Sequence, residues 1–136
     1  MIHVIMGLKG SGKTKKMLDA IHAAVDAAHG DVVCIEYGKK LTYDVTYKVR
    51  LVDSKEYGIK SPEMLKGFIS GLHAGNFDIT HIFLDGLYKL SGSKDPAETA
   101  AFLDWCDAFG TANKMEFTIS ISDELAALPE SVAKYV

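Results

Sequence analysis

The sequence predicts an α/β fold, a three-layer sandwich with a mostly parallel sheet, and two observations lead to this prediction. Short apolar runs alternate along the chain with segments whose apolar residues recur at helical spacing. The apolar run at residues 32–35 is continuous, as expected for a strand covered on both faces. Strands that alternate with helices in this way form parallel sheets with helices packed against them. We expect residues 1–136 to form a single domain.

The first half of the chain predicts three strands and one helix. The apolar run at residues 2–5 is typical of a buried strand. A helix is expected at residues 13–28, where apolar side chains gather on one face. After the strand at residues 32–35, a polar stretch at residues 38–46 precedes a weaker strand at residues 47–52.

The second half predicts two further helices and two further strands. Ser61 followed by Pro62 is typical of a helix start, and the same signal recurs at Asp95. Strands are expected at residues 79–84 and 115–121. Four residues at helical spacing line one face of the later helix: Phe102, Trp105, Cys106 and Phe109. We interpret this stripe as core packing rather than a surface on which a base would stack.

The composition limits the classes of partner. A net charge of −3 gives no electrostatic case for nucleic acid or an anionic membrane as the main partner. Cys34 and Cys106 lie far apart and outside any metal-binding spacing, so we expect buried, reduced thiols. No signal peptide precedes the first strand, and no apolar stretch is long enough to cross a bilayer. We therefore expect a cytoplasmic protein.

A glycine-rich octet lies between the first strand and the first helix. Residues 7–14 read G-L-K-G-S-G-K-T and match G-x-x-x-x-G-K-[ST], the pattern of a phosphate-binding loop, called the P-loop below. The pattern requires a strand before it and a helix after it, and both are predicted here. The alternative is a chance glycine-rich turn, which would not need the complete octet in this context. The octet therefore predicts that the chain binds a nucleoside triphosphate.

Each part of the P-loop has a chemical reason. Glycines let backbone N–H groups point at phosphate oxygens, and the N-terminus of the helix adds its dipole. Lys13 supplies a positive charge for the β- and γ-phosphates, and the Thr14 hydroxyl can ligate Mg²⁺. The expected nucleotide contacts are Gly7, Leu8, Lys9, Gly10, Ser11, Gly12, Lys13, Thr14 and Lys15.

A second candidate site residue is Asp85. It follows the apolar residues 82–84, and an apolar strand that ends in aspartate is the Walker B pattern. A carboxylate at the carboxyl end of a neighbouring strand can hold Mg²⁺ through a water beside Thr14. Residues 86–94 have glycines, serines and no clear period, so we expect a loop that moves with the γ-phosphate.

Three other classes of nucleotide-binding protein are disfavoured. Guanine-nucleotide proteins carry D-x-x-G where Asp85 is followed here by G-L-Y. The tetrapeptide N-K-M-E at residues 113–116 resembles their base-reading N-K-x-D, but it ends in glutamate and precedes a strand. We interpret it as a helix-to-strand turn and favour ATP over GTP. Leu8 stands where partition ATPases with a deviant P-loop need lysine, and the glycine spacing fails the G-x-G-x-x-G order of a dinucleotide fold.

The order of these elements resembles the core of RecA-like ATPases, although only the P-loop is specific in sequence. In that family the strand after the P-loop helix ends in a glutamate that polarises the attacking water, and Glu36 has this position here. A further strand, a helix and the Walker B strand follow in the family, and correspond to residues 47–52, 61–72 and 82–85. A later strand ends in small polar residues, so that Ser120 or Ser122 would sense the γ-phosphate.

The resemblance implies a small ATPase that hydrolyses ATP with Mg²⁺, as an oligomer or with a protein partner that completes the site. The residues implied in catalysis are Lys13, Glu36 and Asp85, with Glu36 orienting the attacking water. The alternative for Glu36 is a solvated charge at a strand end. Arg50 is the only arginine and would be the only candidate arginine finger, although a lone arginine in a strand is more often a surface or ion-pair residue.

Two other functions stay open. Two features favour a nucleotide-dependent switch module with little hydrolysis. The chain has almost no arginine, and Gly86 stands where many related ATPases carry a glutamate after the Walker B aspartate. The layout also resembles small bacterial P-loop kinases such as thymidine kinases. No second zinc-binding or lid segment is present, however, and the sequence names no acceptor pocket.

Overall fold

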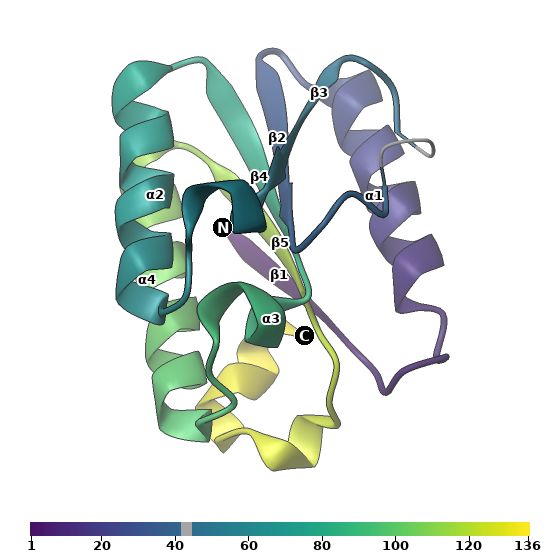
Figure 1. Ribbon diagram of the computed structural model, residues 1–136, viewed down its shortest axis with the longest axis vertical. Helices are drawn as coiled ribbons and strands as arrows, with labels where there is room; N and C mark the ends of the chain where they lie inside the picture. The colour runs from purple at the N-terminus through teal and green to yellow at the C-terminus, as the bar shows by residue number, and fades with distance from the viewer. Residues whose placement is uncertain (42–44) are drawn as a thin grey trace.

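The computed structural model describes residues 1–41 and 45–136, which form a five-stranded sheet with helices on both faces (Figure 1). The strands are β1 (Ile2–Met6), β2 (Asp31–Glu36), β3 (Val49–Asp53), β4 (Ile79–Asp85) and β5 (Glu116–Ile121). The α-helices are α1 (Lys13–Ala27), α2 (Pro62–Gly75), α3 (Leu87–Ser91) and α4 (Pro96–Asn113). Three short 3₁₀ helices are η1 (Ser54–Tyr57), η2 (Leu125–Ala127) and η3 (Glu130–Tyr135). Of the polar stretch expected at residues 38–46, residues 42–44 lie outside the described part of the chain.

The described strands all run parallel, in the order β1-β5-β4-β2-β3. The expected α/β class is therefore confirmed. Strands β1 and β3 occupy the two outer positions of the sheet, and β5 separates β1 from β4. Because parallel strands end on the same side of a sheet, the segments that follow all five strands leave from one edge.

The helices divide between the two faces of the sheet (Figure 1). Met17 and Ile21 of α1 share a buried cluster with Val32, Cys34 and Phe83 on one face. Helices α2 and α4 cover the other face, over a larger apolar cluster. This arrangement is compatible with the expected three-layer sandwich. It also explains why residues 32–35 form a continuous apolar run, since both faces of β2 are covered.

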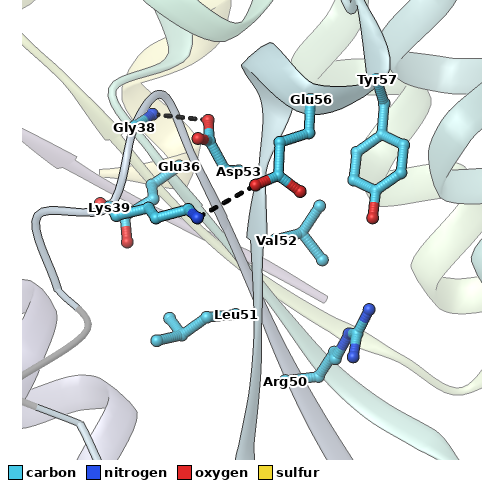
Figure 2. Close-up of a pocket in the computed structure, with 9 residues that line it drawn as sticks. All are labelled: Glu36, Gly38, Lys39, Arg50, Leu51, Val52, Asp53, Glu56 and Tyr57. Atoms are coloured by element: carbon cyan, nitrogen blue, oxygen red, sulfur yellow. Dashed lines mark hydrogen bonds and ion pairs between the residues drawn. The ribbon is translucent and has the colours of Figure 1, made fainter.

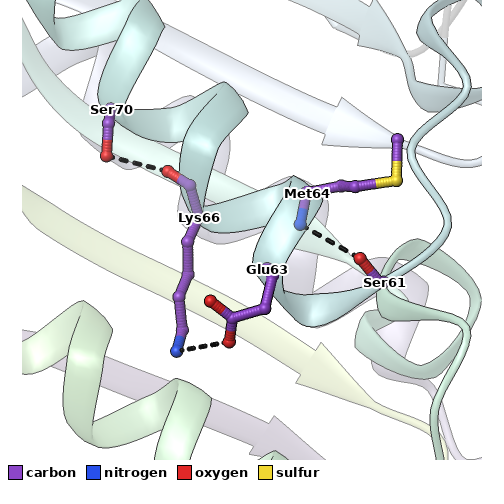
Figure 3. Close-up of polar contacts among 5 residues, drawn as sticks. All are labelled: Ser61, Glu63, Met64, Lys66 and Ser70. Carbon is purple, nitrogen blue, oxygen red and sulfur yellow. Dashed lines mark hydrogen bonds and ion pairs between the residues drawn. The ribbon is translucent and has the colours of Figure 1, made fainter.

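Both helix-start signals in the second half of the sequence are confirmed. The Ser61 hydroxyl accepts a hydrogen bond of 3.1 Å from the N–H of Met64, and Pro62 occupies the first turn of α2 (Figure 3). An ion pair of 3.1 Å between Glu63 and Lys66 spans the same turn. The Asp95 carboxylate caps α4 in the same way. These local signals fix where each helix begins.

The aromatic stripe of α4 packs into the core, as expected. Phe102 is fully buried, and the Trp105 ring stacks on the Phe109 ring with 4.8 Å between centroids. Cys106, which belongs to this stripe, is buried, and Cys34 is buried in β2. Burial raises the pKa of both thiols, so they stay protonated and act as small apolar side chains.

One expectation of the sequence is wrong: residues 86–94 are not a simple loop. Five of them form α3, in which Leu87, Leu90 and Ser91 are buried. Gly86 and Gly92 flank the helix in the left-handed region, with φ of 79° and 66°. A helix of little more than one turn is too short to produce a visible apolar period, so its existence depends on these glycines and on burial.

The segment after β5 packs back onto the large apolar cluster. Val132 and Tyr135 of η3 are buried there, and the Tyr135 hydroxyl donates to the carboxylate of Asp104 in α4. Among the helices of the described residues, none has both the length and the apolar character that a membrane span needs.

His81 is a partly buried ionisable residue in the middle of the sheet. Its ring stacks on Phe83 with 4.1 Å between centroids, and Nε2 lies 2.8 Å from the Thr118 hydroxyl. Burial lowers the pKa of His81 from 6.5 to about 4, although the nearby Glu116 carboxylate acts in the opposite direction. The ring is therefore neutral in the folded protein at pH 7.

We predict that His81 makes the protein lose stability between about pH 6.5 and pH 4. Over this range the unfolded chain takes up a proton on His81 and the folded chain does not. The free energy of unfolding therefore falls by about 3 kcal/mol in total. His81→Gln should reduce the loss of unfolding free energy, measured by urea denaturation at several pH values. His29→Gln, a change at an exposed histidine, serves as the control. Equal pH profiles for wild type and His81→Gln would contradict the prediction.

Candidate functional site

The P-loop connects the end of β1 to the start of α1, as the sequence pattern requires. Gly10 and Gly12 have φ of 84° and 87°, in the left-handed region that favours glycine. Gly7 is needed for a different reason, because a Cβ there would lie 2.2 Å from the Ser11 hydroxyl. The N–H of Ser11 donates to the Leu8 carbonyl at 3.0 Å and closes the turn. The backbone conformation therefore favours glycine at positions 10 and 12, whereas a Cβ at Gly7 would require the Ser11 side chain to move.

The N-terminus of α1 differs from those of the other long helices. Helices α2 and α4 each have a side-chain cap, whereas no side chain caps α1 and its first turn contains no acidic residue. The first helical hydrogen bond joins the Lys16 N–H to the Gly12 carbonyl. The N–H groups before it have no acceptor within the helix. This end of α1 can therefore accept an anion.

The lysines of this segment point in different directions. The Lys13 ammonium donates to the Leu8 carbonyl at 3.1 Å and so lies back across the loop. The Lys15 ammonium pairs with Asp19, one turn further along α1, at 2.9 Å. This pair raises the pKa of Lys15. Lys15 can therefore contribute its backbone N–H to a ligand at the helix N-terminus, while its side chain is engaged elsewhere.

Asp85 ends β4 and takes part in a hydrogen-bonded chain that crosses to the neighbouring strand. The Ser120 hydroxyl of β5 donates to Asp85 Oδ1 at 3.0 Å and accepts from the Gly86 N–H at 2.8 Å. Ser120 is 1% exposed, whereas Ser122 is exposed. Of the two serines proposed from the sequence, Ser120 is the one in contact with Asp85. It lies on β5, between β1 and β4.

Glu36 is buried at the end of β2, so the alternative of a solvated charge is wrong. The residue is only 2% exposed. Its carboxylate accepts hydrogen bonds from the N–H groups of Lys40, at 2.9 Å, and Leu41, at 3.2 Å. Burial raises the pKa of Glu36 and these hydrogen bonds oppose the shift, while Asp85 and Asp53 add to it. The carboxylate therefore anchors the segment that follows β2.

Asp53 is a carboxylate that the sequence did not single out. The register places Glu36 between Asp85 on β4 and Asp53 on β3, so that three acidic side chains end three adjacent strands. Asp53 Oδ1 accepts from the N–H of Gly38 at 2.8 Å (Figure 2) and from that of Lys55 at 3.0 Å. Its position after an apolar run was the only available signal, and many strands end in Asp.

A pocket of about 290 Å³ lies beside Glu36 at this end of the sheet (Figure 2). Lys39 and Glu56 form an ion pair of 3.1 Å across it. Arg50 lines it further along β3. Because β3 and β1 are the two outer strands, separated by ~19 Å at four strand spacings, Arg50 lies far from the P-loop of its own chain.

The tetrapeptide at residues 113–116 is a helix-to-strand turn, as predicted. Asn113 ends α4, Lys114 caps it with φ of 56°, and Glu116 begins β5. This turn therefore lies at the amino end of β5, whereas the P-loop follows the carboxyl end of β1. It cannot read a base bound next to the P-loop.

Comparison with known proteins leaves the family of this chain open. Neither the protein-family models nor the curated protein sequences compared with it give a match. Among the described residues, no group of three or more His, Cys, Asp and Glu side chains is arranged to hold a metal ion. The P-loop and the residues at the carboxyl edge of the sheet are therefore the features that bear on function.

We predict that Ser120→Ala destabilises the protein by about 1–3 kcal/mol, because the Gly86 N–H loses its acceptor in a partly buried position. Ser122→Ala removes a hydroxyl two residues away on the exposed side and should change the free energy of unfolding by less than about 0.5 kcal/mol. Urea denaturation of the two variants and wild type measures the difference. The hydrogen-bonded chain is not important for stability if the two variants unfold alike.

Proposed function

We propose that this protein binds ATP with Mg²⁺ at the P-loop and hydrolyses it. The observation that carries the proposal is the complete octet of residues 7–14 at a helix N-terminus that no side chain caps. Because Gly12 at the N-cap has no side chain, these N–H donors are open to a ligand. Phosphate oxygens would accept from them and interact favourably with the helix dipole.

Lys13 is the expected counter-charge for the β- and γ-phosphates. In the structure its ammonium donates to the backbone carbonyl of Leu8. On nucleotide binding, Lys13 would exchange this neutral acceptor for a charged phosphate oxygen. The Lys13 ammonium is charged in both cases, and a negatively charged acceptor adds Coulombic attraction to the hydrogen bond. This exchange favours nucleotide binding.

Thr14 and Asp85 fit the small number of protein ligands that Mg²⁺ takes beside phosphates. Mg²⁺ keeps several waters and uses one or two side chains together with phosphate oxygens. The Thr14 hydroxyl is exposed in the first turn of α1, and Asp85 ends a strand two positions from β1 in the sheet. At that separation Asp85 would hold the ion through water. The bound ion would supply charge stabilisation for the phosphates.

The favoured nucleotide is ATP. The segment that resembled a guanine-reading motif lies at the opposite edge of the sheet, so no described feature favours GTP. The expected arrangement in the cell, as an oligomer or with a protein partner, stays part of the proposal.

Two observations bear on whether the protein hydrolyses ATP or acts as a switch. The pKa of Glu36, next to Asp85, is raised. This favours a role as a base, because a catalytic base works best when its pKa is close to the ambient pH. Ser120 links Asp85 by hydrogen bonds to Gly86, the residue before α3. These bonds favour a switch, because they join the proposed magnesium ligand to a short helix. Hydrolysis remains our primary proposal, and the switch is the second.

We predict that Lys13→Ala abolishes detectable ATP binding in calorimetric titration, because the phosphates lose their close counter-charge. Lys16→Ala, at an exposed lysine one turn into the same helix, should keep the affinity within about twofold. Wild type should also show a thermal shift, since ATP at a hundred times Kd stabilises the folded state by about 2.7 kcal/mol. Unchanged affinity in Lys13→Ala would rule out the P-loop as the site.

We predict that Glu36→Gln keeps ATP affinity and lowers phosphate release by about a hundredfold, because a water-orienting carboxylate acts on the transition state more than on bound ATP. The amide oxygen can still accept from the Lys40 and Leu41 N–H groups, so the fold should persist. Asp53→Asn, at the next carboxylate in register, is the control and should keep turnover.

Equal turnover in Glu36→Gln and wild type would remove Glu36 from the mechanism. ATP binding without turnover in wild type, at any protein concentration, would support the switch instead.

A further inference from the structure

The turn after β2 wraps around the side chain of Glu36. Glu36 ends the strand, and its carboxylate accepts from the N–H groups of Lys40 and Leu41, four and five residues later. Leu41 is itself buried, in the same apolar cluster as the buried face of α1. The direction in which the carboxylate points therefore depends on where this turn lies.

Asp53 holds the same turn from the neighbouring strand. Its Oδ1 atom accepts from the N–H of Gly38 at 2.8 Å (Figure 2) and from the N–H of Lys55 at 3.0 Å. Burial acts to raise the pKa of Asp53, but these two hydrogen bonds and the charges of nearby lysines lower it overall. A charged acceptor makes stronger hydrogen bonds than a neutral one. Asp53 therefore ties the turn after β2 to the start of η1.

Gly38 is the point at which Asp53 can control the turn. Its φ is 101°, in the left-handed region that favours glycine. Glycine loses more conformational freedom on folding than any other residue, so a hydrogen bond to its N–H restrains a position that is otherwise flexible. Without this acceptor the backbone would gain freedom two residues after Glu36. The N–H groups of Lys40 and Leu41, which hold the carboxylate, would then move with it.

An ion pair between the same two segments is more exposed. Lys39 of the turn and Glu56 of η1 approach to 3.1 Å, and both side chains are half exposed or more (Figure 2). Ion pairs of this kind contribute little, because water and salt screen them. The partly buried hydrogen bond from Gly38 to Asp53 is therefore the stronger restraint on the turn.

We propose that Asp53 is a positioning residue for ATP hydrolysis: it holds Gly38, and through this turn it keeps Glu36 in the orientation that directs the attacking water. This inference rests on the proposed function, in which Glu36 orients that water. Asp53 ends one outer strand of the sheet, whereas the P-loop follows the other outer strand. Loss of the Asp53 carboxylate should therefore lower turnover and leave the affinity for ATP unchanged.

The test measures ATP hydrolysis and calorimetric titration of ATP, both with Mg²⁺, for wild type, Asp53→Ala and Asp53→Asn. Asp53→Ala removes the acceptor, so kcat should fall at least about tenfold while Kd for ATP stays within about twofold, because a small misplacement of a catalytic group slows the reaction strongly. Asp53→Asn keeps an oxygen that accepts from Gly38 and should keep turnover. Amide exchange followed by NMR should be faster at Gly38, Lys40 and Leu41 in Asp53→Ala than in wild type or Asp53→Asn.

Ser61→Ala is the matched control, because it also removes a side-chain acceptor from a backbone N–H, at 3.1 Å, but at the start of α2. Urea denaturation should show a loss of stability in both alanine variants, and Ser61→Ala should keep kcat and the amide exchange at Gly38. Equal losses of turnover in the two alanine variants would mean that stability alone explains the effect, and would overturn the inference.

Wild-type turnover in Asp53→Ala, or an equal loss in Asp53→Asn, would also overturn the inference and would leave the proposed function intact. ATP binding without turnover in wild type would instead overturn the proposed hydrolysis, and this inference with it.

Discussion

Because the five strands run parallel, their carboxyl ends meet at one edge of the sheet, and the position of every candidate residue depends on that alignment. The register determines which strand ends are neighbours: Glu36 stands between Asp53 and Asp85. A slip by one residue would turn the side chains of a strand to the opposite face. The apolar clusters on the two faces oppose such a slip, since it would expose one set and bury polar side chains. The core therefore sets the geometry of the charged edge.

This edge concentrates like charges, and backbone hydrogen bonds offset part of the cost. The Glu36 carboxylate accepts from the N–H groups of Lys40 and Leu41, and the Asp53 carboxylate accepts from that of Gly38. These contacts also order the segment after β2, so the same carboxylates that repel one another hold the chain around them. Burial still outweighs the hydrogen bonds at Glu36, and its pKa is raised. Carboxylates with shifted pKa values are found preferentially at functional sites, which supports this edge as the candidate site.

Features that depend on neighbouring residues in the chain could be predicted from the sequence, and features that depend on register could not. The P-loop glycines and the Ser61 cap are local signals, and both have the expected geometry. Helix α3 was missed because it is short and depends on Gly86 and Gly92. The strand expected from residue 47 begins at Val49 instead, since Tyr47 is 94% exposed.

The third carboxylate is the clearest example of what register adds. Asp53 and Asp85 meet Glu36 only through the pairing of β2 with both β3 and β4. A single sequence contains no pairing signal between such distant segments, because strand order is decided by the packing of helices on the two faces.

The two leading proposals for function, hydrolysis and switching, use the same connection at α3. Ser120 donates to Asp85 and accepts from the Gly86 N–H at the start of the helix, while the Tyr88 hydroxyl of α3 donates to Asp123 at 2.8 Å, just beyond β5. The water of an ion held by Asp85 would share this carboxylate with Ser120. A change in the position of α3 and the binding of magnesium nucleotide would then be linked, and by thermodynamic necessity each would affect the other equally. Hydrolysis would determine how long the bound state lasts, and the hydrogen bonds of Ser120 would provide the link.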